Sequence, residues 1–205
     1  KVSKKKKPII LSTGMANLDE IAVAVKTIKK FKNNKITLLH CTTNYPCLFY
    51  EVNLKAMVEI EKKFNLSIGY SDHTQSILVP VMAVAMGARV LEKHFTLDKN
   101  MLGPDHKASA NPKELKEIID SIRKAEKILG DGIKKPTESE EKIKKLVRKS
   151  IVARKDILKG EKIRSTMLII KRPGTGIEPK YLSKVTNSVA RKNIKADQLI
   201  SWNDI

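Results

Sequence analysis

Two histidines in this sequence lie in polar clusters that directly follow short apolar runs. His73 stands in the run Gly-Tyr-Ser-Asp-His-Thr, and His94 stands in the run Leu-Glu-Lys-His-Phe-Thr. Alternate residues of a strand share a face, so Ser71 lies with His73 and Glu92 lies with His94. Two neutral imidazoles with open positions beside them suit manganese, zinc or iron. The pattern predicts a two-histidine metal site at neighbouring strand ends, although each histidine alone also fits a simple hydrogen bond to a loop.

Hydroxyl side chains follow the same expected strand ends. Hydroxyls and backbone N–H groups at strand-to-helix turns together form a cradle for an anion such as phosphate. Serine and threonine at such turns also serve as ordinary helix caps, and the spacing leaves both interpretations open. The residues concerned are Ser12, Thr13, Thr42, Thr43 and Ser71.

Two further motifs contain side chains that suit ligand binding. The run Gly-Pro-Asp-His at 103–106 lies in a long loop, and loops of this length are often functional. Asp105 can hydrogen-bond sugar hydroxyls, and His106 suits either a third metal ligand or a turn-stabilising role. Arg172 lies in a tight Lys-Arg-Pro-Gly turn near the other end of the chain, where its type alone indicates a surface arginine.

The elements that must position these residues repeat as a short apolar run, a turn and an amphipathic helix. The apolar runs are apolar on both faces, as is typical of parallel strands covered by helices. The last helix has clear end signals, with Asn111 as N-cap, Pro112 at the first helical position and Gly130 after its end. The expected strands are 8–11, 36–41, 66–69 and 89–97, and the expected helices are 18–30, 53–64, 76–86 and 113–129.

Four βα units predict an α/β fold with a parallel sheet and right-handed crossovers. A doubly wound sheet and a (β/α)8 barrel both fit, but a complete barrel needs about 250 residues. We expect a partial barrel over 1–130 and a charged linker over 131–148 that contains a short helix. A small β-rich domain is expected over 149–205, with strand-like runs at 150–153, 167–171 and 185–190.

The composition bounds the classes of function. The formal charge of +19 suggests nucleic acid, but the lysines are interleaved with acidic residues and aromatic residues are only 4%. We therefore predict no nucleic-acid partner, and a positive field that favours small anionic substrates. Apolar runs are shorter than the roughly 18 residues of a membrane span, which predicts no membrane partner. Two cysteines, Cys41 and Cys47, form no disulfide framework and favour a cytoplasmic location.

Six motifs together resemble the N-acetylneuraminate (sialic acid) synthase family. They occur in the family's order from Pro8 to the C-terminus, and their combination is specific although each one alone is weak. The motifs read KPIILSTGMA, LLHCTTNYP, GYSDHT, LEKHFTLD, GPDHKAS and KRPGTGI.

The resemblance implies the second half of a (β/α)8 TIM barrel followed by an SAF or antifreeze-like β-clip domain. It implies a divalent metal, manganese or magnesium, on His73 and His94. It also implies a domain-swapped homodimer in which Arg172 reaches the partner's site. The other implied contacts are Ser12 and Ser71 with phosphate, Thr43 at a position where some members have asparagine, and Tyr45, Glu92 and Asp105 with the sugar.

The implied activity is the condensation of phosphoenolpyruvate with an N-acetylated sugar aldehyde, such as N-acetylmannosamine, to a nonulosonic acid and phosphate. Legionaminic and pseudaminic acid synthases are alternatives within this class. The family's first four βα units lie upstream and bear a catalytic carboxylate and lysines, so we expect these 205 residues alone to be an incomplete catalyst. Two readings from other classes stay open, namely a nucleic-acid-binding module and a non-catalytic interaction fragment.

Overall fold

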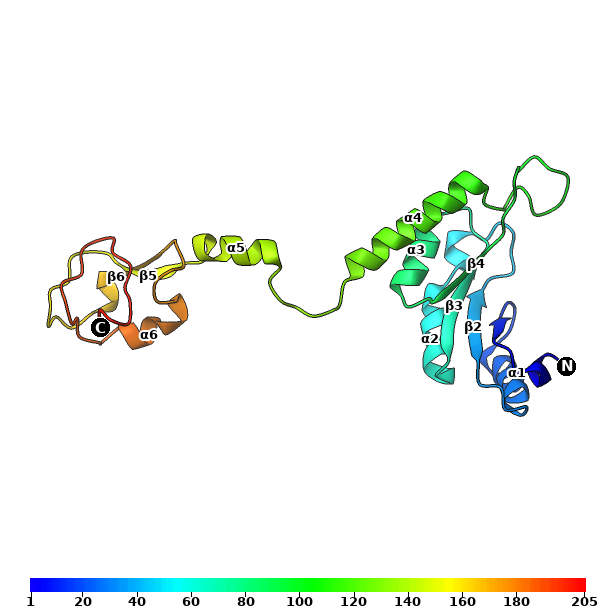
Figure 1. The fold of residues 1–205 in the computed structure, drawn as a ribbon, viewed down its shortest axis with the longest axis horizontal. Coiled ribbons are helices and arrows are strands. Elements are labelled where there is room, and N and C mark those ends of the chain that lie inside the picture. Colours follow the sequence, from blue (N-terminus) through cyan, green and yellow to red (C-terminus); the bar gives the residue numbers. More distant parts are fainter. The chain divides into compact units, whose positions relative to one another are not determined.

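Four short strands form a parallel sheet in the order β1-β2-β3-β4. The computed structural model describes residues 1–205, which divide into a first unit, 1–132, and a second unit, 133–205 (Figure 1). Strands that are parallel and adjacent in chain order require crossover connections, and helices supply them here. The first unit contains β1 (Ile9–Ser12), α1 (Leu18–Lys29), β2 (Ile36–Cys41), α2 (Leu54–Phe64), β3 (Ser67–Asp72), α3 (Leu78–Ala85), β4 (Val90–Lys93) and α4 (Pro112–Leu129).

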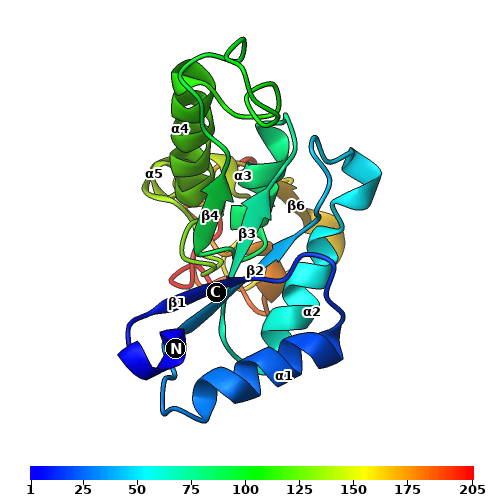
Figure 2. The same ribbon diagram turned by 90° about the vertical axis from the view of Figure 1, so that its right-hand side faces the viewer.

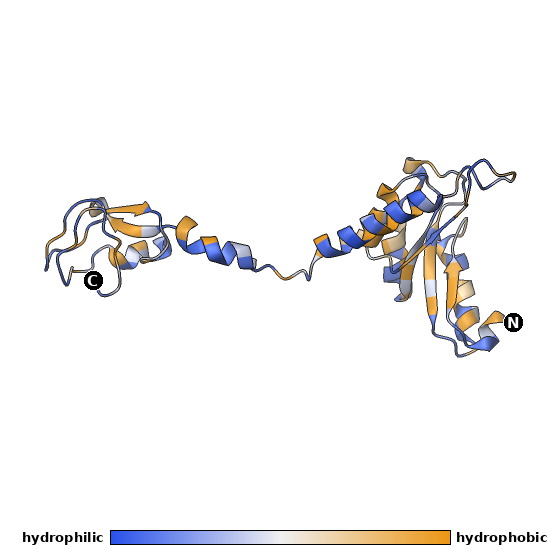
Figure 3. Cartoon of the chain, turned by 45° about the horizontal axis from the view of Figure 1, so that its top comes forward, coloured by the Kyte–Doolittle hydropathy of each residue, from blue (hydrophilic) through white to orange (hydrophobic).

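The middle of the sheet is covered on both faces, so apolar residues occupy both faces of its strands. Leu38 and Leu39 are consecutive in β2, so they point to opposite faces, and both are fully buried. Met57 of α2 and Ile68 of β3 are also fully buried in the same core. The strands and the helices around them can be followed in Figure 2, and Figure 3 shows the apolar colour on the strands. This core fixes the positions at which the strands end.

The helix ends of the first unit follow the sequence signals. The Asn17 side chain accepts hydrogen bonds from the first turn of α1, and the Glu20 carboxylate accepts one from the backbone N–H of Asn17. Asn111 and Glu114 form the same capping box at α4, which begins at Pro112. These reciprocal bonds satisfy backbone N–H groups that have no partner within the helix, and they confirm the predicted start of α4.

The carboxyl ends of β3 and β4 lie several residues from their predicted positions, and the other strand bounds of the first unit differ from the prediction by at most one residue. β3 extends to Asp72 rather than ending at residue 69, because its register with β4 continues as far as the pair of Asp72 and Lys93. β4 ends at Lys93 rather than at residue 97. After Lys93 the chain leaves the sheet and pairs with Ala110 instead, through an isolated bridge from Phe95. Both histidines therefore stand one residue beyond a strand end.

The second unit is built around an antiparallel pair of short strands. Ser150 lies opposite Lys171 in this pair. The predicted strand 150–153 is confirmed and the second strand begins one residue later than predicted. The predicted strand 185–190 is wrong, because Val185 is the last residue of a short helix and its carbonyl accepts the hydroxyl of Ser188. The unit contains α5 (Glu138–Val147), β5 (Ser150–Ala153), β6 (Leu168–Lys171) and α6 (Leu182–Val185).

Isoleucines fill the core of the second unit. Ile157 and Ile194 exchange backbone hydrogen bonds of 2.8 and 2.9 Å, although neither lies in a regular strand. The helix α5, expected within a linker, bonds to this unit, since the backbone carbonyl of Lys145 accepts a 2.7 Å bond from the Gly174 N–H. The fully or almost fully buried isoleucines are Ile151, Ile157, Ile163, Ile194 and Ile200.

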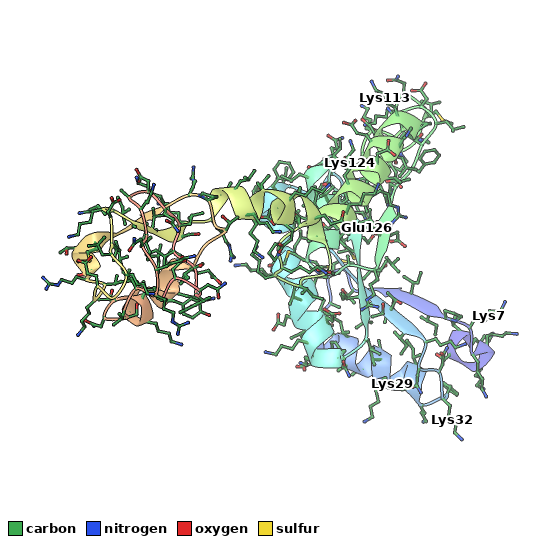
Figure 4. The ribbon with its side chains drawn as sticks, turned by 60° about the vertical axis from the view of Figure 1, so that its left-hand side comes forward. Lys7, Lys29, Lys32, Lys113, Lys124 and Glu126 are labelled. Carbon is green, nitrogen blue, oxygen red and sulfur yellow. The ribbon has the colours of Figure 1, made fainter.

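Lysines dominate the surface of the first unit. Lys113 and Lys124 project from α4, and Lys29 and Lys32 project near the end of α1 (Figure 4). Acidic side chains pair with some lysines along the helices, as in the 2.7 Å contact of Lys116 with Asp120. Exposed pairs of this kind contribute little to stability. No helix of the chain is long and apolar enough to span a membrane.

Candidate active site

His73 and His94 meet at the carboxyl edge of the sheet. Their ring centroids are 5.3 Å apart and their ring planes are nearly perpendicular, at 85°. His73 follows the last residue of β3 and His94 follows the last residue of β4. The carboxyl edge is where parallel α/β folds bind ligands. The convergence predicted from the two motifs is therefore present in the structure.

A backbone carbonyl determines the tautomer of His73. The His73 Nδ1 atom lies 2.7 Å from the carbonyl oxygen of Thr42. A carbonyl only accepts, so Nδ1 of the neutral ring holds the proton and Nε2 presents its lone pair. The His73 carbonyl in turn accepts a 2.8 Å bond from the Cys47 N–H. Metal-binding histidines are usually held by such a bond from the other ring nitrogen.

Ser71 and Glu92 form a hydrogen-bonded polar pair beside the histidines. Ser71 Oγ donates a 2.7 Å hydrogen bond to Glu92 Oε1 and lies 3.4 Å from His73 Nε2. The serine hydroxyl is buried and directs its proton to the carboxylate, so it leaves the lone pair of His73 Nε2 unused. Residues expected to share a face of each strand thus lie together.

Tyr45 packs against both histidines. Its ring centroid is 4.2 Å from that of His73 and 5.2 Å from that of His94. The loop after β2 that bears Tyr45 is held in place by Glu51, whose carboxylate accepts from Asn44 and whose carbonyl accepts from the Thr42 hydroxyl. Tyr45 is 46% exposed, so its ring forms a wall that a ligand can reach.

Contacts in the loop 97–109 distinguish between the two predicted roles of His106, a third metal ligand and a turn-stabilising residue. His106 Nδ1 lies 2.8 Å from the Thr96 hydroxyl, which supports the turn-stabilising role. Asp105 Oδ2 lies 3.9 Å from His94 Nδ1, too far for a hydrogen bond. The Asp105 side chain is 59% exposed and is available to a ligand beside His94.

The hydroxyl residues near the site divide into two groups. The Thr13 and Thr42 hydroxyls both donate to backbone carbonyls, so they stabilise the fold. Ser12 and Thr43 are exposed at the ends of β1 and β2. A Cβ atom at Gly14 would lie 2.4 Å from Thr43 Oγ1, so glycine is required for this close approach of the two loops.

Arg172 belongs to the second unit, unlike the other predicted site residues. It is exposed on the turn after β6, and its Nε donates a 3.1 Å hydrogen bond to the Val147 carbonyl. This bond orients the base of the guanidinium group. The terminal nitrogens remain available for a ligand.

Cys41 and Cys47 are buried and free of disulfides. Burial raises the pKa of both thiols above the ordinary value. Both side chains therefore stay protonated and act as small apolar groups, as predicted for Cys41.

The donor set fits a divalent transition metal. Two imidazoles lie face to edge, and the lone pair of His73 Nε2 is oriented by the bond at Nδ1. No cluster of three or more histidine, cysteine, aspartate or glutamate residues in residues 1–205 is suited to hold a metal. A metal on the two histidines would therefore leave positions for water or substrate.

Sequence reasoning missed two residues that lie directly behind the histidines. Asp72 and Lys93 form a buried ion pair with a 2.8 Å contact. The available signal was their position, since each one immediately precedes a site histidine.

A parallel α/β half-barrel with a polar site at its carboxyl edge, joined to a small β-rich domain, defines the class of this protein. The chain belongs to the NeuB family, which matches residues 1–134. An SAF domain matches residues 148–205. The two matched segments correspond to the two units of the structure.

Named relatives extend over nearly all of this chain. The N,N'-diacetyllegionaminic acid synthase of Campylobacter jejuni is 54% identical over 202 residues, 98% of this chain and 60% of the relative. The enzyme of the same name from Legionella pneumophila is 49% identical over 205 residues, 98% of this chain and 58% of the relative. The chain thus spans about three fifths of the length of these curated relatives.

A solved structure shows the same architecture for the larger part of the chain. The N-acetylneuraminic acid (sialic acid) synthetase of Leptospira borgpetersenii, determined in complex with citrate, is 40% identical. It matches with a TM-score of 0.64 over 69% of this chain and 49% of its own.

Proposed function

We propose that this protein condenses phosphoenolpyruvate with an N-acetylated sugar aldehyde to give a nonulosonic acid and phosphate. The methylene carbon of phosphoenolpyruvate bonds to the aldehyde carbon, water adds at the carbon bearing the phosphate, and phosphate leaves. The supporting observation is the convergence of His73 and His94, with the lone pair of His73 Nε2 facing a polar site. Membership of the NeuB family supports the same reaction class.

The two histidines are the proposed ligands of a divalent metal. Imidazole ligands favour manganese over magnesium, which prefers oxygen ligands. When bound, the metal supplies Lewis-acid polarisation of the aldehyde oxygen. The Thr42 carbonyl keeps His73 in the tautomer that presents Nε2, and burial keeps its ring in place. Asp105, 3.9 Å from His94, places a negative charge beside the second imidazole.

The remaining predicted residues are assigned to the two substrates. Ser12 and Ser71, with Thr43, are proposed to contact the phosphate of phosphoenolpyruvate, because hydroxyls and backbone N–H groups near strand-to-helix turns suit an anion. Tyr45 and Glu92, with Asp105, line the side proposed for the sugar: the Tyr45 ring offers an apolar face, and the carboxylates accept from sugar hydroxyls. The net charge of +19 favours the approach of anionic phosphoenolpyruvate.

Arg172 is proposed to act in the site of a second copy of the protein. Its exposed guanidinium on a fixed turn suits a contact with the N-acyl or hydroxyl groups of the sugar. A domain-swapped homodimer would bring this turn to the partner's first unit.

The proposed sugar is the aldehyde precursor of N,N'-diacetyllegionaminic acid. The two relatives at 49% and 54% identity bear that name, whereas the sialic acid synthetase matched in structure is 40% identical. N-acetylmannosamine is the second candidate.

A substrate panel tests the proposal. Because the relatives are longer than this chain, the full-length protein is incubated with phosphoenolpyruvate, Mn²⁺ and each aldehyde in turn. Released phosphate and product mass are then measured. We expect a nonulosonic acid, with kcat/KM at least about tenfold higher for the legionaminic precursor than for N-acetylmannosamine. A reversed preference would select the second candidate, and the lack of product from any aldehyde would refute the proposed reaction.

A further inference from the structure

Behind the two histidines lies an ion pair that is removed from water. Lys93 Nζ is 2.8 Å from Asp72 Oδ2, and their side chains are 6% and 0% exposed. The two residues are direct partners in the register of β3 and β4. Charges in an interior are costly unless they are paired and hydrogen-bonded, so this pair calls for a physical reason.

The pair lies on the opposite side of the strand ends from the site. Neighbouring residues of a strand point to opposite faces, so Lys93 points away from Glu92 and with Leu91. Leu91 packs against apolar clusters formed with the helices. Lys93 is therefore placed behind the substrate region and acts through other groups.

Hydrogen bonds from the pair enclose the backbone of His73. Asp72 Oδ1 accepts a 2.9 Å bond from the Thr74 N–H, and Lys93 Nζ donates to the Thr74 carbonyl. Thr74 is fully buried. The residues on both sides of His73 are thus tied to Lys93, whose own backbone continues directly into His94. This is a direct link between the backbones of the two histidines.

We propose that the Asp72–Lys93 pair is a positioning device that sets the separation and orientation of His73 and His94 for metal binding. The inference rests on the proposed function, in which both imidazoles share one metal. Metal and catalytic sites require supporting groups that hold the ligands to within about 0.5 Å. An ion pair across two neighbouring strands supplies this restraint where the regular sheet ends.

A double variant tests the pair without leaving a single buried charge. Asp72→Asn retains an acceptor for the Thr74 N–H, and Lys93→Met preserves side-chain length without a charge. The matched control is Lys99→Gln with Glu114→Gln, because these residues also form a 2.7 Å ion pair in the first unit. Glutamine at position 114 preserves the capping box of α4.

The primary measurement is a titration of the full-length protein with Mn²⁺ alone, in which binding is monitored by calorimetry and electron paramagnetic resonance. We expect the double variant to bind Mn²⁺ about tenfold more weakly, as when the supporting groups of metal ligands are altered. The control double variant should stay within about twofold of the wild type. Unchanged Mn²⁺ affinity in a folded Asp72→Asn, Lys93→Met protein would overturn the inference.

A structural measurement separates this inference from the proposed function. If the wild type binds no Mn²⁺, the metal assignment fails, and a crystal structure of the double variant then decides the positioning role. We expect the ring separation to depart from 5.3 Å and the bond from His73 to the Thr42 carbonyl to lengthen. An unchanged arrangement would refute positioning. If the double variant does not fold, Asp72→Asn with Lys93→Gln provides the same two measurements without a buried charge, because glutamine retains a donor for the Thr74 carbonyl, and we expect a loss of about threefold in affinity.

Discussion

The two units use buried polar side chains for different purposes. In the first unit, Ser71, Asp72, His73 and Thr74 are consecutive and each is at most 8% exposed. They lie at the end of β3, where they face a neighbouring strand and two loops. In the second unit, buried Ser150 accepts from the Gly176 N–H and donates to the carbonyl of residue 173, so it closes a turn.

The buried polar residues of the first unit belong to the candidate site, whereas those of the second unit support its fold. Burying four polar residues in a row is costly, and the first unit offsets that cost with hydrogen bonds, one of which orients the His73 imidazole. The second unit contains a core of aliphatic side chains, and its polar bonds fix the turn that presents Arg172. The comparison predicts that substitutions in the buried polar run at the end of β3 change chemistry, whereas substitutions in the second unit change stability or substrate affinity.

The largest expected effect is the loss of turnover in the first unit. His73→Ala in the full-length protein should lower kcat by at least about 10³-fold, or about 4 kcal/mol, and abolish Mn²⁺ stimulation. Steady-state rates with and without Mn²⁺ check this. His40→Asn is the matched control, because the His40 ring also bonds a backbone carbonyl, that of Val52, at 2.9 Å. Normal metal-stimulated activity in His73→Ala would contradict the prediction that buried polar residues of the first unit serve the chemistry.

A core variant of the second unit should act on stability alone. Ile157 is fully buried, so Ile157→Ala should destabilise this unit by about 3 kcal/mol and Ile157→Val by about 1 kcal/mol. Trp202, the one tryptophan of this sequence, lies in the second unit and reports its unfolding in urea by fluorescence. An equal shift in unfolding of the first unit, measured by hydrogen exchange, would show that the two units do not unfold separately.

Arg172 belongs to the second unit but is expected to affect substrate binding rather than stability. Arg172→Ala should raise the KM for the sugar about tenfold, or about 1.4 kcal/mol, with the KM for phosphoenolpyruvate within about twofold. Arg154→Ala, another exposed arginine of the second unit, serves as control. A change confined to phosphoenolpyruvate kinetics would contradict the assigned contact.

The smallest expected effect concerns the pH dependence of the second unit. Burial alone would raise the pKa of Asp204, but bonds from Lys192 and Ser201 outweigh it and hold the pKa below its ordinary value. The carboxylate therefore contributes stability above about pH 4, and this contribution is lost as the pH falls through the folded-state pKa. Asp204→Asn should cost about 1 kcal/mol at pH 7 and remove this component. Unfolding in urea from pH 7 to 3 measures it; an unchanged acid dependence would contradict the pairing.

Local patterns predicted most of the first unit because each of its elements follows its own periodicity. The capping residues of α4 and the apolar runs of β2 required no knowledge of distant residues. The predicted strand 185–190 failed for the opposite reason. Val185 is fully buried in the core of the second unit, at the end of a short helix. In the sequence, a buried apolar residue of a short helix cannot be distinguished from a buried apolar residue of a strand.

The sequence by itself determined that His73 and His94 would meet, because both follow adjacent parallel strands whose ends share one edge. Only the tertiary structure decided which nitrogen of His73 presents a lone pair, since that depends on a carbonyl 31 residues away. It also decided that His106 supports a turn and that Asp72 pairs with Lys93. Hydrogen bonds and ion pairs between distant residues depend on strand register and loop path, and a linear pattern of residue types does not specify them.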